Sequence, residues 1–459
     1  MKQLIYIMTN PILLTDSYKL THWLMYPKEL EYMYTYFESR KGAEYPETVF
    51  VGLQVIIKRF LCIKITMEHI DEAEEICNLH LGPGLFNRNM WEHILYAHNG
   101  KLPLIIKAVP EGTVVPINNV LMTIENTDSK CAALVGHFET ILTHVWYPST
   151  VATVSRTIKH IIKPYVYETC DDMLSLPYML HDFGYRGVET IDAAGMGGLG
   201  HLVNFCSTDT LEAVLFVRRY YGDKMVGFSV PASEHSNMTI KGVIGEYGMI
   251  EHIIDKFPTG IISCVMDSYN INDAIKFLCL IKNKILTRNG KFVIRPDSGD
   301  PVGVIMDVLQ LLEQSFPVNL NKKGYKVLDS HIGIIYGDGL TTNVIEKILQ
   351  VLKSNGWASC NIVFGMGGGL LQKVNRDTQR NAMKCSAVTW SDHRTTDVYK
   401  DPIGSDKKSK SGKQKLIYVN NEYKTVRLDE YSDLPDLLQI VFENGEQYNT
   451  TTFKEIREI

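Results

Sequence analysis

The stretch Ile332–Gly369, IGIIYGDGLTTNVIEKILQVLKSNGWASCNIVFGMGGG, shows most clearly the pattern from which we predict the fold. A short apolar run ends in Gly337, Asp338 and Gly339, an amphipathic segment follows, and a second apolar run ends in glycines. Apolar residues in the middle segment recur at i, i+3, i+4 and i+7, which is the period of a helix. The stretch therefore predicts a strand, a helix and a second strand.

The same pattern recurs from about residue 178 to residue 369. The other apolar runs are YMLHDFG, HLVNFCSTD, GFSVPASEH, IISCVMDS and FVIRPDSG, and helix-like segments lie between them. Strands that alternate with helices pair in parallel and are buried on both faces. This repetition predicts an α/β fold, an irregular (β/α) barrel. The alternative is an open doubly wound sheet, which would usually carry one dominant glycine loop after its first strand.

The two ends of the chain differ from this middle part. The N-terminal part combines an aromatic run, EYMYTYFESR, with the helix-like MEHIDEAEEICNLHL and the strand-like LPLIIKAVPEGTVVP, and the C-terminal part contains the strand-rich KLIYVNNEYKTVRL. We therefore expect residues 1–150 and 385–459 to form one α+β domain, and residues 151–384 to form the catalytic barrel.

The composition excludes several classes of protein. Hydrophobic residues make up 45% of the 459 residues, and the formal net charge of −5 does not favour binding to nucleic acid or to a membrane surface. No apolar run approaches the roughly 20 residues of a membrane helix, and the N-terminus is a poor signal peptide. The nine cysteines form no CxxC pair, which indicates a reduced, cytoplasmic protein and argues against a zinc site.

In a barrel, the carboxyl ends of all strands open onto one face. Glu234 and His235 stand at such an end, after the strand-like run Gly227–Val230. The other charged residues at strand ends are Asp182, Asp209, Asp267, Arg295, Asp297 and Asp338. We expect these side chains to surround one pocket. Arg295 can hold a phosphate or a planar ring and Asp297 ribose hydroxyls or a magnesium-bound water, unless the two form only a surface ion pair.

Other segments carry candidate chemistry, each with a plainer alternative. The glycines of Phe364–Lys373 suit a phosphate site, or a tight turn with positive φ. His235 is a candidate base or phosphate acceptor whose pKa Glu234 would raise, or a structural histidine. Phe183 is able to stack on a flat ring, or belongs to the core. The lysine-rich Ser405–Lys415 is a loop that neutralises polyphosphate, or a solvated loop.

Taken together, these motifs resemble those of the nicotinamide phosphoribosyltransferases, a family of type II phosphoribosyltransferases. Matching motifs occur in order over nearly the whole chain and include LLTDSYKLTH, LHDFGYRG, SVPASEHS, IRPDSG and FGMGGGLLQK. The resemblance implies a pentosyltransferase of NAD salvage that makes nicotinamide mononucleotide and pyrophosphate from nicotinamide and phosphoribosyl pyrophosphate. It also implies ATP as co-substrate, hydrolysed through a phosphohistidine, and Mg²⁺ bound mainly through pyrophosphate and water. The expected assembly is a cytoplasmic homodimer with active sites at the subunit interface.

The resemblance also implies the roles of single residues. The catalytic set is His235, which carries the phosphoryl group, with Glu234, Asp267, Asp297 and Asp338. The nicotinamide ring is expected to contact Phe183, Arg295 and, from the second subunit, Tyr18. The carboxamide of nicotinamide is expected to contact Asp209. The residues implied to hold phosphate or pyrophosphate are Arg186, Gly337, Gly367, Gly368, Arg376 and Lys384, with Arg40, Lys400 and Lys408 supplied by the partner. Asp16, Ser263 and His181 are expected near the site.

Three other functions remain open at this point. A nicotinate phosphoribosyltransferase is the nearest, and the contact of Asp209 with the carboxamide would distinguish it. A non-catalytic binder with the same fold should have lost His235, Arg295, Asp297 or Asp338, and all four are present. A phosphate-binding barrel isomerase would need neither the lysine-rich stretch nor Tyr18.

Overall fold

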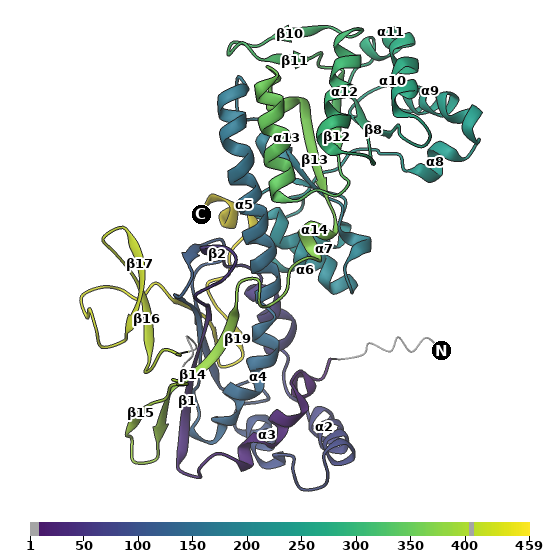
Figure 1. Cartoon of the computed structure of the whole chain (residues 1–459). Helices are drawn as coiled ribbons and strands as arrows, with labels where there is room; N and C mark the ends of the chain where they lie inside the picture. The colour runs from purple at the N-terminus through teal and green to yellow at the C-terminus, as the bar shows by residue number, and fades with distance from the viewer. Residues whose placement is uncertain (1–8, 404–407) are drawn as a thin grey trace, which may run out of the picture. The chain divides into compact units, whose positions relative to one another are not determined.

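The computed structural model describes residues 9–403 and 408–459 (Figure 1). The chain forms two compact units. Unit 1 consists of Met1–Thr153, Phe216–Asp223 and Asn375–Ile459, and unit 2 consists of Val154–Leu215 and Lys224–Val374. The C-terminal part of unit 1 thus begins earlier than the expected residue 385, because a boundary at 384 would cut strand β14 (Asn381–Trp390).

Unit 2 is built on a parallel sheet of six strands in the order β7-β6-β13-β12-β9-β8. All five strand pairings in this sheet are parallel. The strands are β6 (Leu180–Asp182), β7 (Ser207–Thr208), β8 (Ile262–Val265), β9 (Phe292–Arg295), β12 (Ile332–Tyr336) and β13 (Ile362–Met366). Their residues are largely buried, which explains why these strands read as continuous apolar runs.

The segment 228–232 joins the two edges of this sheet. Phe228 makes a parallel bridge to Ser207 in the edge strand β7, and Ala232 makes one to Ser263 in the other edge strand, β8. The run Gly227–Val230, expected to be a strand, therefore forms only one isolated bridge, at Phe228. Pro231 follows it and has no N–H to donate, so a regular ladder cannot continue there. The result is the irregular barrel that the sequence predicts.

Helices follow the strands of unit 2 as expected. They are α6 (Ile191–Leu202), α7 (Leu211–Tyr220, whose last turns belong to unit 1), α8 (His235–Thr239), α9 (Glu246–Lys256), α10 (Ile271–Leu280), α11 (Lys282–Leu286), α12 (Pro301–Glu313), α13 (Thr342–Ser354) and α14 (Gly368–Leu371). Side chains of Asn270, Asp300 and Thr341 cap the N-termini of α10, α12 and α13. In Figure 1, α12 lies between α10 and α13, against which it packs.

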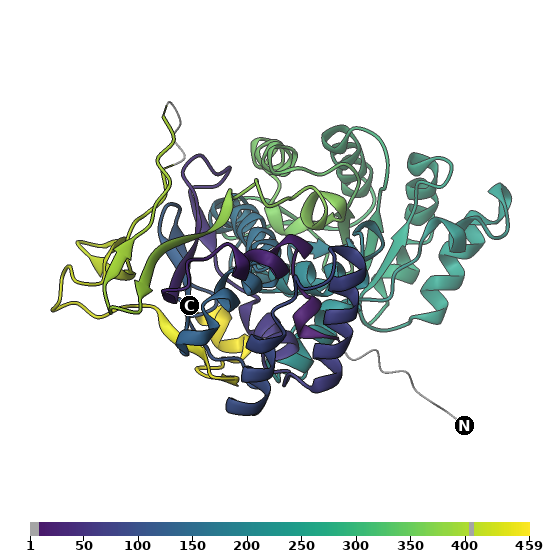
Figure 2. The same ribbon diagram turned by 90° about the horizontal axis from the view of Figure 1, so that it is seen from below.

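Unit 1 is an α+β unit around a seven-stranded sheet in the order β15-β14-β1-β5-β3-β18-β19. These strands are β1 (Leu30–Ser39), β3 (Leu104–Ala108), β5 (Val120–Asn126), β14 (Asn381–Trp390), β15 (Thr395–Asp397), β18 (Gln439–Glu443) and β19 (Glu446–Gln447). The separate hairpin of β16 (Gln414–Val419) and β17 (Glu422–Arg427), yellow-green in Figure 2, corresponds to the strand-rich segment predicted after residue 385.

Short elements complete the two units. β2 (Glu47–Val49) pairs with β4 (Val114–Pro116) in unit 1, and β10 (Val318–Leu320) pairs with β11 (Lys326–Leu328) in unit 2. The remaining α-helices are α1 (Leu53–Ile56), α2 (Met67–His80), α3 (Arg88–Ala97), α4 (Ala133–Thr143), α5 (Trp146–Thr169) and α15 (Phe453–Glu458). No helix within the described parts of the chain has both the length and the apolar character needed to cross a membrane.

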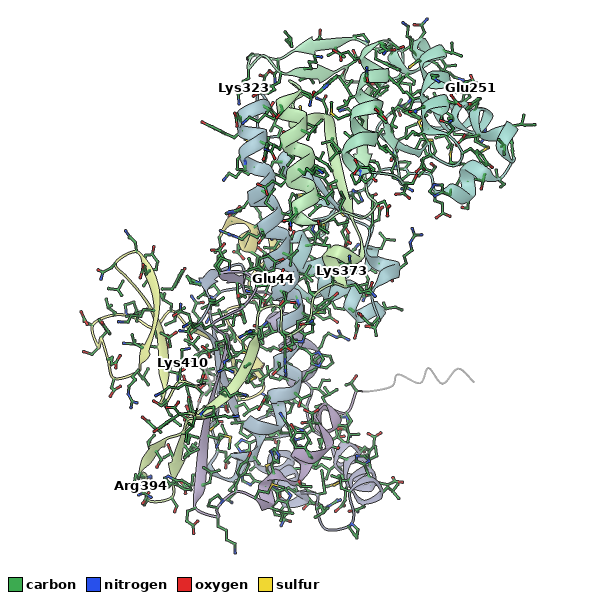
Figure 3. The ribbon with its side chains drawn as sticks, viewed as in Figure 1. Glu44, Glu251, Lys323, Lys373, Arg394 and Lys410 are labelled. Atoms are coloured by element: carbon green, nitrogen blue, oxygen red, sulfur yellow. The ribbon has the colours of Figure 1, made fainter. Side chains whose placement is uncertain are left out.

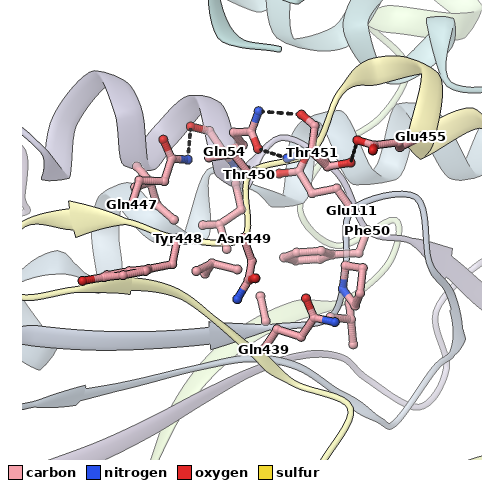
Figure 4. Close-up of a pocket in the computed structure, with 16 residues that line it drawn as sticks. Phe50, Gln54, Glu111, Gln439, Gln447, Tyr448, Asn449, Thr450, Thr451 and Glu455 are labelled. Carbon is pink, nitrogen blue, oxygen red and sulfur yellow. Dashed lines mark hydrogen bonds between the residues drawn. The ribbon is translucent and has the colours of Figure 1, made fainter. Parts of the chain in front are cut away.

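The two ends of the chain meet in unit 1 around Gln54. Its side chain donates to Thr451 O (3.1 Å) and accepts from Thr451 N–H (3.0 Å), and Gln447 Nε2 donates to Gln54 O (3.3 Å) (Figure 4). A hollow of about 260 Å³ lies beside these contacts. Nearby, Glu111 accepts from Gln54 N–H (2.7 Å) and Tyr221 Oη (2.6 Å). These bonds explain why segments far apart in sequence form one α+β unit.

Candidate active site

The carboxyl ends of the parallel strands in unit 2 carry the predicted site residues. Within three residues of a strand end stand Phe183 after β6, Asp209 after β7, Asp267 after β8, Asp297 after β9, Asp338 after β12 and Gly367 after β13. Because parallel strands all end at the same edge of a sheet, these residues share one side of unit 2. Hydrogen bonds, ion pairs and ring contacts show which of these side chains meet.

Phe183 and Arg295 form an aromatic and cationic surface. The Arg295 Cζ atom lies 6.0 Å from the centroid of the Phe183 ring. The centroid of the His181 ring lies 4.9 Å from the centroid of the same phenyl ring. The ring occupies space that two glycines leave open, because a Cβ at Gly365 would lie 2.0 Å from Phe183 Cε2 and one at Gly337 would lie 3.1 Å from it. A phenyl ring with a guanidinium group beside it is able to stack on a planar ring of a ligand. Phe183 is only partly buried, which argues against a purely core role.

Asp209 lies beside this surface as a carboxylate. Its Oδ1 atom is 3.0 Å from His181 Nε2 and accepts a hydrogen bond from Ser229 Oγ. Burial raises the pKa of Asp209, but the contacts with His181 and Ser229 and the charge of Arg295 outweigh burial and hold that pKa below its ordinary value. Asp209 therefore presents a negative charge at neutral pH.

His235, the first residue of α8, contacts a buried acid. Its Nε2 atom lies 3.0 Å from Asp267 Oδ1, and the side chain of His235 is 48% exposed whereas that of Asp267 is 5% exposed. The second oxygen of Asp267 accepts from Asp297 N–H (2.8 Å) and Ser298 Oγ (2.5 Å). Asp267 is thus held in place from β9 and is able to orient the imidazole.

Glu234, the acid that was expected to raise the pKa of His235, is not the acid in contact with the imidazole. Glu234 is the N-cap of α8, where its backbone N–H donates to Asn237 Oδ1 (3.0 Å), and its side chain accepts from Ser236 Oγ (2.5 Å). Its Oε2 atom also lies 3.9 Å from the exposed Arg186 guanidinium. Adjacent residues at a helix start point apart, so Asp267, brought in from β8, takes the place beside the imidazole.

Acidic groups crowd the space next to His235. Burial raises the pKa of Asp297, Asp267 and Asp338 raise it further, and Arg295 and His235 oppose them. Burial and the same three acids raise the pKa of Tyr336 to about 12. Carboxylate oxygens in such a group suit a hard divalent cation, which would relieve their mutual repulsion.

Asp182, also expected in the pocket, has a structural place instead. It is fully buried, and its carboxylate accepts from Gly184 N–H (2.7 Å) and Thr208 Oγ1 (3.1 Å). Ser263 is likewise buried inside β8, where its backbone pairs with Pro231 and Ser233. These residues position the strand ends rather than face a ligand.

The glycine cluster forms the start of α14. Gly365, Gly367, Gly368 and Gly369 are not among the glycines with positive φ, so the alternative of a tight turn with positive φ is wrong for them. Close packing explains two of these glycines, because a Cβ at Gly365 would lie 2.0 Å from Phe183 Cε2 and one at Gly369 would lie 2.9 Å from Met366 Cε. Three consecutive residues, Gly367 to Gly369, carry no side chains, so a phosphate could approach the backbone there.

Four predicted phosphate residues gather in unit 1. Burial lowers the pKa of Lys384, Glu139 opposes this, and the positive charges of Arg40, Arg376 and Lys400 lower it further. Lys384 lies on β14 opposite Tyr36 on β1, and Arg40 directly follows β1. A cluster of like charges is stable when an anion is bound to it.

Three lysines of the lysine-rich stretch fit neither predicted alternative, a loop that neutralises polyphosphate or a solvated loop. Lys410, labelled in Figure 3, pairs with the buried Glu38, and Lys413 pairs with Glu125. Lys415 donates to the backbone carbonyl of Tyr431 (2.8 Å). These three lysines neutralise acids or cap backbone groups of unit 1 and are buried or only partly exposed, so they are not free for polyphosphate. Residues 405–407 of the stretch lie outside the described residues.

The remaining predicted residues lie at the surface. In unit 1, Tyr18 is 57% exposed, and Asp16 accepts from Thr140 Oγ1 (2.7 Å). Lys408 pairs with Asp401 (2.9 Å). Arg186 has a side chain that is 91% exposed.

Three residues near the site were not predicted from the sequence. Ser229 and Ser298 bond to Asp209 and Asp267, and both stand in motifs already quoted, GFSVP and PDSG. Glu246 begins α9 and is 3% exposed. Burial raises its pKa, Ser268 opposes this, and Asp267 raises it further. Its position eleven residues after His235 has no spacing signal that could have marked it.

Comparison with known proteins identifies the class that this site and fold define. The model of the nicotinate phosphoribosyltransferase (NAPRTase) family matches residues 178–446, and that of the nicotinamide phosphoribosyltransferase N-terminal domain matches residues 10–106. The first match covers more than half of the chain. The chain therefore belongs to the nicotinate phosphoribosyltransferase family and is a phosphoribosyl-transferring enzyme, a pentosyltransferase of pyridine-nucleotide synthesis.

Particular relatives match over nearly their full length. A nicotinamide phosphoribosyltransferase of Xanthomonas campestris is 44% identical over 98% of this chain and 97% of its own length. One of Acinetobacter baylyi is 32% identical over 98% and 96%. Among solved structures, nicotinate-nucleotide pyrophosphorylase of Pyrococcus furiosus has a TM-score of 0.62 at 17% identity, covering 100% of this chain and 97% of that one. At that identity the structural match shows the fold alone, and it confirms the predicted type II phosphoribosyltransferase architecture.

Proposed function

We propose that this enzyme makes nicotinamide mononucleotide and pyrophosphate from nicotinamide and phosphoribosyl pyrophosphate. One observation carries the choice of nicotinamide: a carboxylate, Asp209, is held ionised beside the surface of Phe183 and Arg295. A carboxylate accepts a hydrogen bond from a carboxamide NH₂ but repels the carboxylate of nicotinate. A mismatch of this kind costs on the order of a few kcal/mol. The two relatives above carry the corresponding name.

In the proposed reaction, the pyridine nitrogen attacks the anomeric carbon of the ribose and pyrophosphate leaves with the electrons of the broken C–O bond. Nicotinamide needs no strong base, because its ring nitrogen is unprotonated near neutral pH. The residues therefore position the ring and stabilise charge. Asp297 and Asp338 would hold Mg²⁺ through its waters, which their mutual electrostatic influence supports. When bound, this ion would neutralise charge on the leaving pyrophosphate.

His235 is the proposed phosphoryl acceptor. If Nε2 carries the proton that is shared with Asp267, the lone pair lies on Nδ1, which attacks the γ-phosphorus of ATP as ADP leaves. Water later hydrolyses the phosphohistidine. His235→Ala should abolish the phosphoenzyme and ATP hydrolysis, while slow ATP-independent synthesis persists. Labelled phosphate retained by that variant after incubation with γ-labelled ATP would refute the assignment. A wild-type label that is lost in acid but stable in base identifies phosphohistidine.

The proposed enzyme is a cytoplasmic homodimer that completes each active site with Tyr18, Arg40, Lys400 and Lys408 from the partner subunit. Because Arg376 and Lys384 cluster with Arg40 and Lys400 in one chain, the same subunit would supply them to that site. The exposure of Tyr18 supports its contribution to a partner's site. The free thiols of all nine cysteines support the cytoplasmic location. Mixing two inactive variants, Tyr18→Ala and Asp209→Ala, should restore part of the activity, because mixed dimers contain one intact site. Failure to restore activity in a mixture that forms mixed dimers would contradict shared sites.

One assay tests the function as a whole. The pure protein is incubated with phosphoribosyl pyrophosphate and Mg²⁺, with nicotinamide or nicotinate, and with or without ATP, and the nucleotide formed is identified by chromatography and mass. We expect nicotinamide mononucleotide, with more product when ATP is present. Nicotinate mononucleotide as the main product would instead support a nicotinate phosphoribosyltransferase, the activity named by the family model.

A further inference from the structure

Unit 1 contains a second cluster of polar side chains that the proposed reaction does not use. His93 lies in α3, His98 caps the C-terminus of that helix, and Asp128 precedes the short helix Ser129–Cys131. The Nε2 atoms of His93 and His98 lie 2.9 Å and 2.8 Å from the same atom, Asp128 Oδ2. The three donor atoms all lie within 4.8 Å of one another. We propose that these three residues bind a divalent transition-metal ion of the Zn²⁺ type.

The chemistry of the three donors favours this class of ion. Two imidazole nitrogens and one carboxylate oxygen are typical ligands of Zn²⁺ and similar ions, whereas Mg²⁺ and Ca²⁺ prefer oxygen donors alone. Around a tetrahedral ion with metal–ligand bonds of about 2.0–2.1 Å, neighbouring donor atoms lie about 3.3 Å apart. The two separations from Asp128 Oδ2, 2.9 Å and 2.8 Å, are a few tenths of an ångström shorter, so small side-chain rotations would admit an ion.

The backbone holds the three ligands in place. Asp128 Oδ1 accepts from Lys130 N–H (2.8 Å), which leaves Oδ2 to face the imidazoles. The buried Asn126 donates to the carbonyl of Asp128 (2.8 Å) and so fixes the segment between β5 and the carboxylate. Such outer bonds orient metal ligands before the ion binds. The two imidazole planes are inclined by 80°, so their Nε2 atoms approach Asp128 from different directions.

The site is open enough for an ion to enter. The side chains of His93, His98 and Asp128 are 23%, 26% and 20% exposed. With three protein ligands, a tetrahedral ion would keep one position for water. Sequence spacing could not reveal this site, because the histidines lie five residues apart with no cysteine partner and the acid lies thirty residues further on.

The test is metal binding by the full chain after removal of bound metal with a chelator. Co²⁺ serves as a spectroscopic probe and Zn²⁺ as the titrant in calorimetry. His93→Gln removes one ligand, whereas Asp128→Asn keeps the Oδ1 acceptor for Lys130 N–H and thus the local fold. His252→Gln, on the exposed side of α9, is the matched control.

Wild type and His252→Gln should bind one more Zn²⁺ per chain than the two cluster variants. Losing a ligand should weaken binding at this site by more than the roughly 10–100-fold that loss of an outer partner costs. Zn²⁺ should also raise the melting temperature of wild type more than that of Asp128→Asn. Equal stoichiometry and affinity in all four proteins, or no binding to wild type, would overturn the proposal and leave the cluster as a hydrogen-bonded tether of α3.

Discussion

Gly365→Ala should disable the site by displacing Phe183. The new Cβ would lie 2.0 Å from Phe183 Cε2, 2.6 Å from Cδ2 and 2.9 Å from Cζ, whereas ordinary contact begins at 3.4 Å. The ring must therefore move by at least the difference between 3.4 and 2.0, which is 1.4 Å. Backbone pairing holds Gly365 in β13 against His181, so the ring rather than the strand has to shift.

The displaced ring should no longer stack on the pyridine. A misplacement of about 1 Å at a reacting centre costs on the order of 100-fold, and we expect a loss of that size in kcat/KM for nicotinamide. The extra methyl in a packed site should also destabilise the fold by about 1–3 kcal/mol. Initial rates of nucleotide formation, with nicotinamide varied and phosphoribosyl pyrophosphate saturating, measure the first effect. Thermal unfolding measures the second.

Two controls separate this cause from a general loss of packing. Gly333→Ala places the same methyl in β12, where the nearest atom is the flexible Lys291 Cδ at 3.3 Å, so activity should be nearly unchanged. In a Phe183→Ala background, Gly365→Ala should cost little more, because the clash is gone. If Gly365→Ala is folded and keeps wild-type kinetics, or if its effect is fully additive with Phe183→Ala, the reasoning fails.

Two further predictions concern charge. Burial, together with Asp267 and Asp338, raises the pKa of Asp297 above the ordinary 3.8. The folded state therefore binds the proton of this carboxyl more tightly than the unfolded chain does. As a result, ionisation of Asp297 at neutral pH lowers the free energy of unfolding. Asp297→Asn should therefore raise the melting temperature at pH 7 while abolishing synthesis, and the gain should vanish below pH 3.8; a lower melting temperature at pH 7 would contradict this. Lys384→Met should raise the KM for phosphoribosyl pyrophosphate about tenfold or more and leave the KM for nicotinamide unchanged, since Lys384 belongs to a cluster of cations that suits an anion. Kinetics with each substrate varied in turn decide it, and the opposite pattern of KM values would refute it.

The barrel and most of its strand ends could be predicted because their physical signals are local. Helices such as Thr342–Ser354 show a regular apolar period, and the parallel strands are short apolar runs with a polar residue after them. Once the strands are parallel, their ends must share an edge, which brings Asp209, Asp267 and Asp297 to one side without any further information.

Other features depend on contacts that a local pattern does not contain. Helix α6 has four glycines, which disfavour a helix, but a Cβ at Gly198 would lie 2.5 Å from Ala213 Cβ, so tertiary packing overrides propensity. The partner of His235 is Asp267 rather than its neighbour Glu234, because a side chain at a helix start points away from the preceding one. The lysines after residue 408 appear free in sequence, whereas Glu38 and Glu125, far earlier in the chain, pair with two of them.

The central claim is that the strand ends of unit 2 form one base-binding site whose ionised Asp209 selects nicotinamide. Equal concentrations of nicotinamide and nicotinate, each carrying a different isotope, compete for the enzyme, and the ratio of the two labelled nucleotides is measured for wild type and Asp209→Asn. We predict a strong excess of nicotinamide mononucleotide from wild type. In Asp209→Asn the ratio should fall by roughly 100-fold, which corresponds to about 2.7 kcal/mol of lost discrimination. An unchanged ratio in a folded, active Asp209→Asn enzyme would contradict the account.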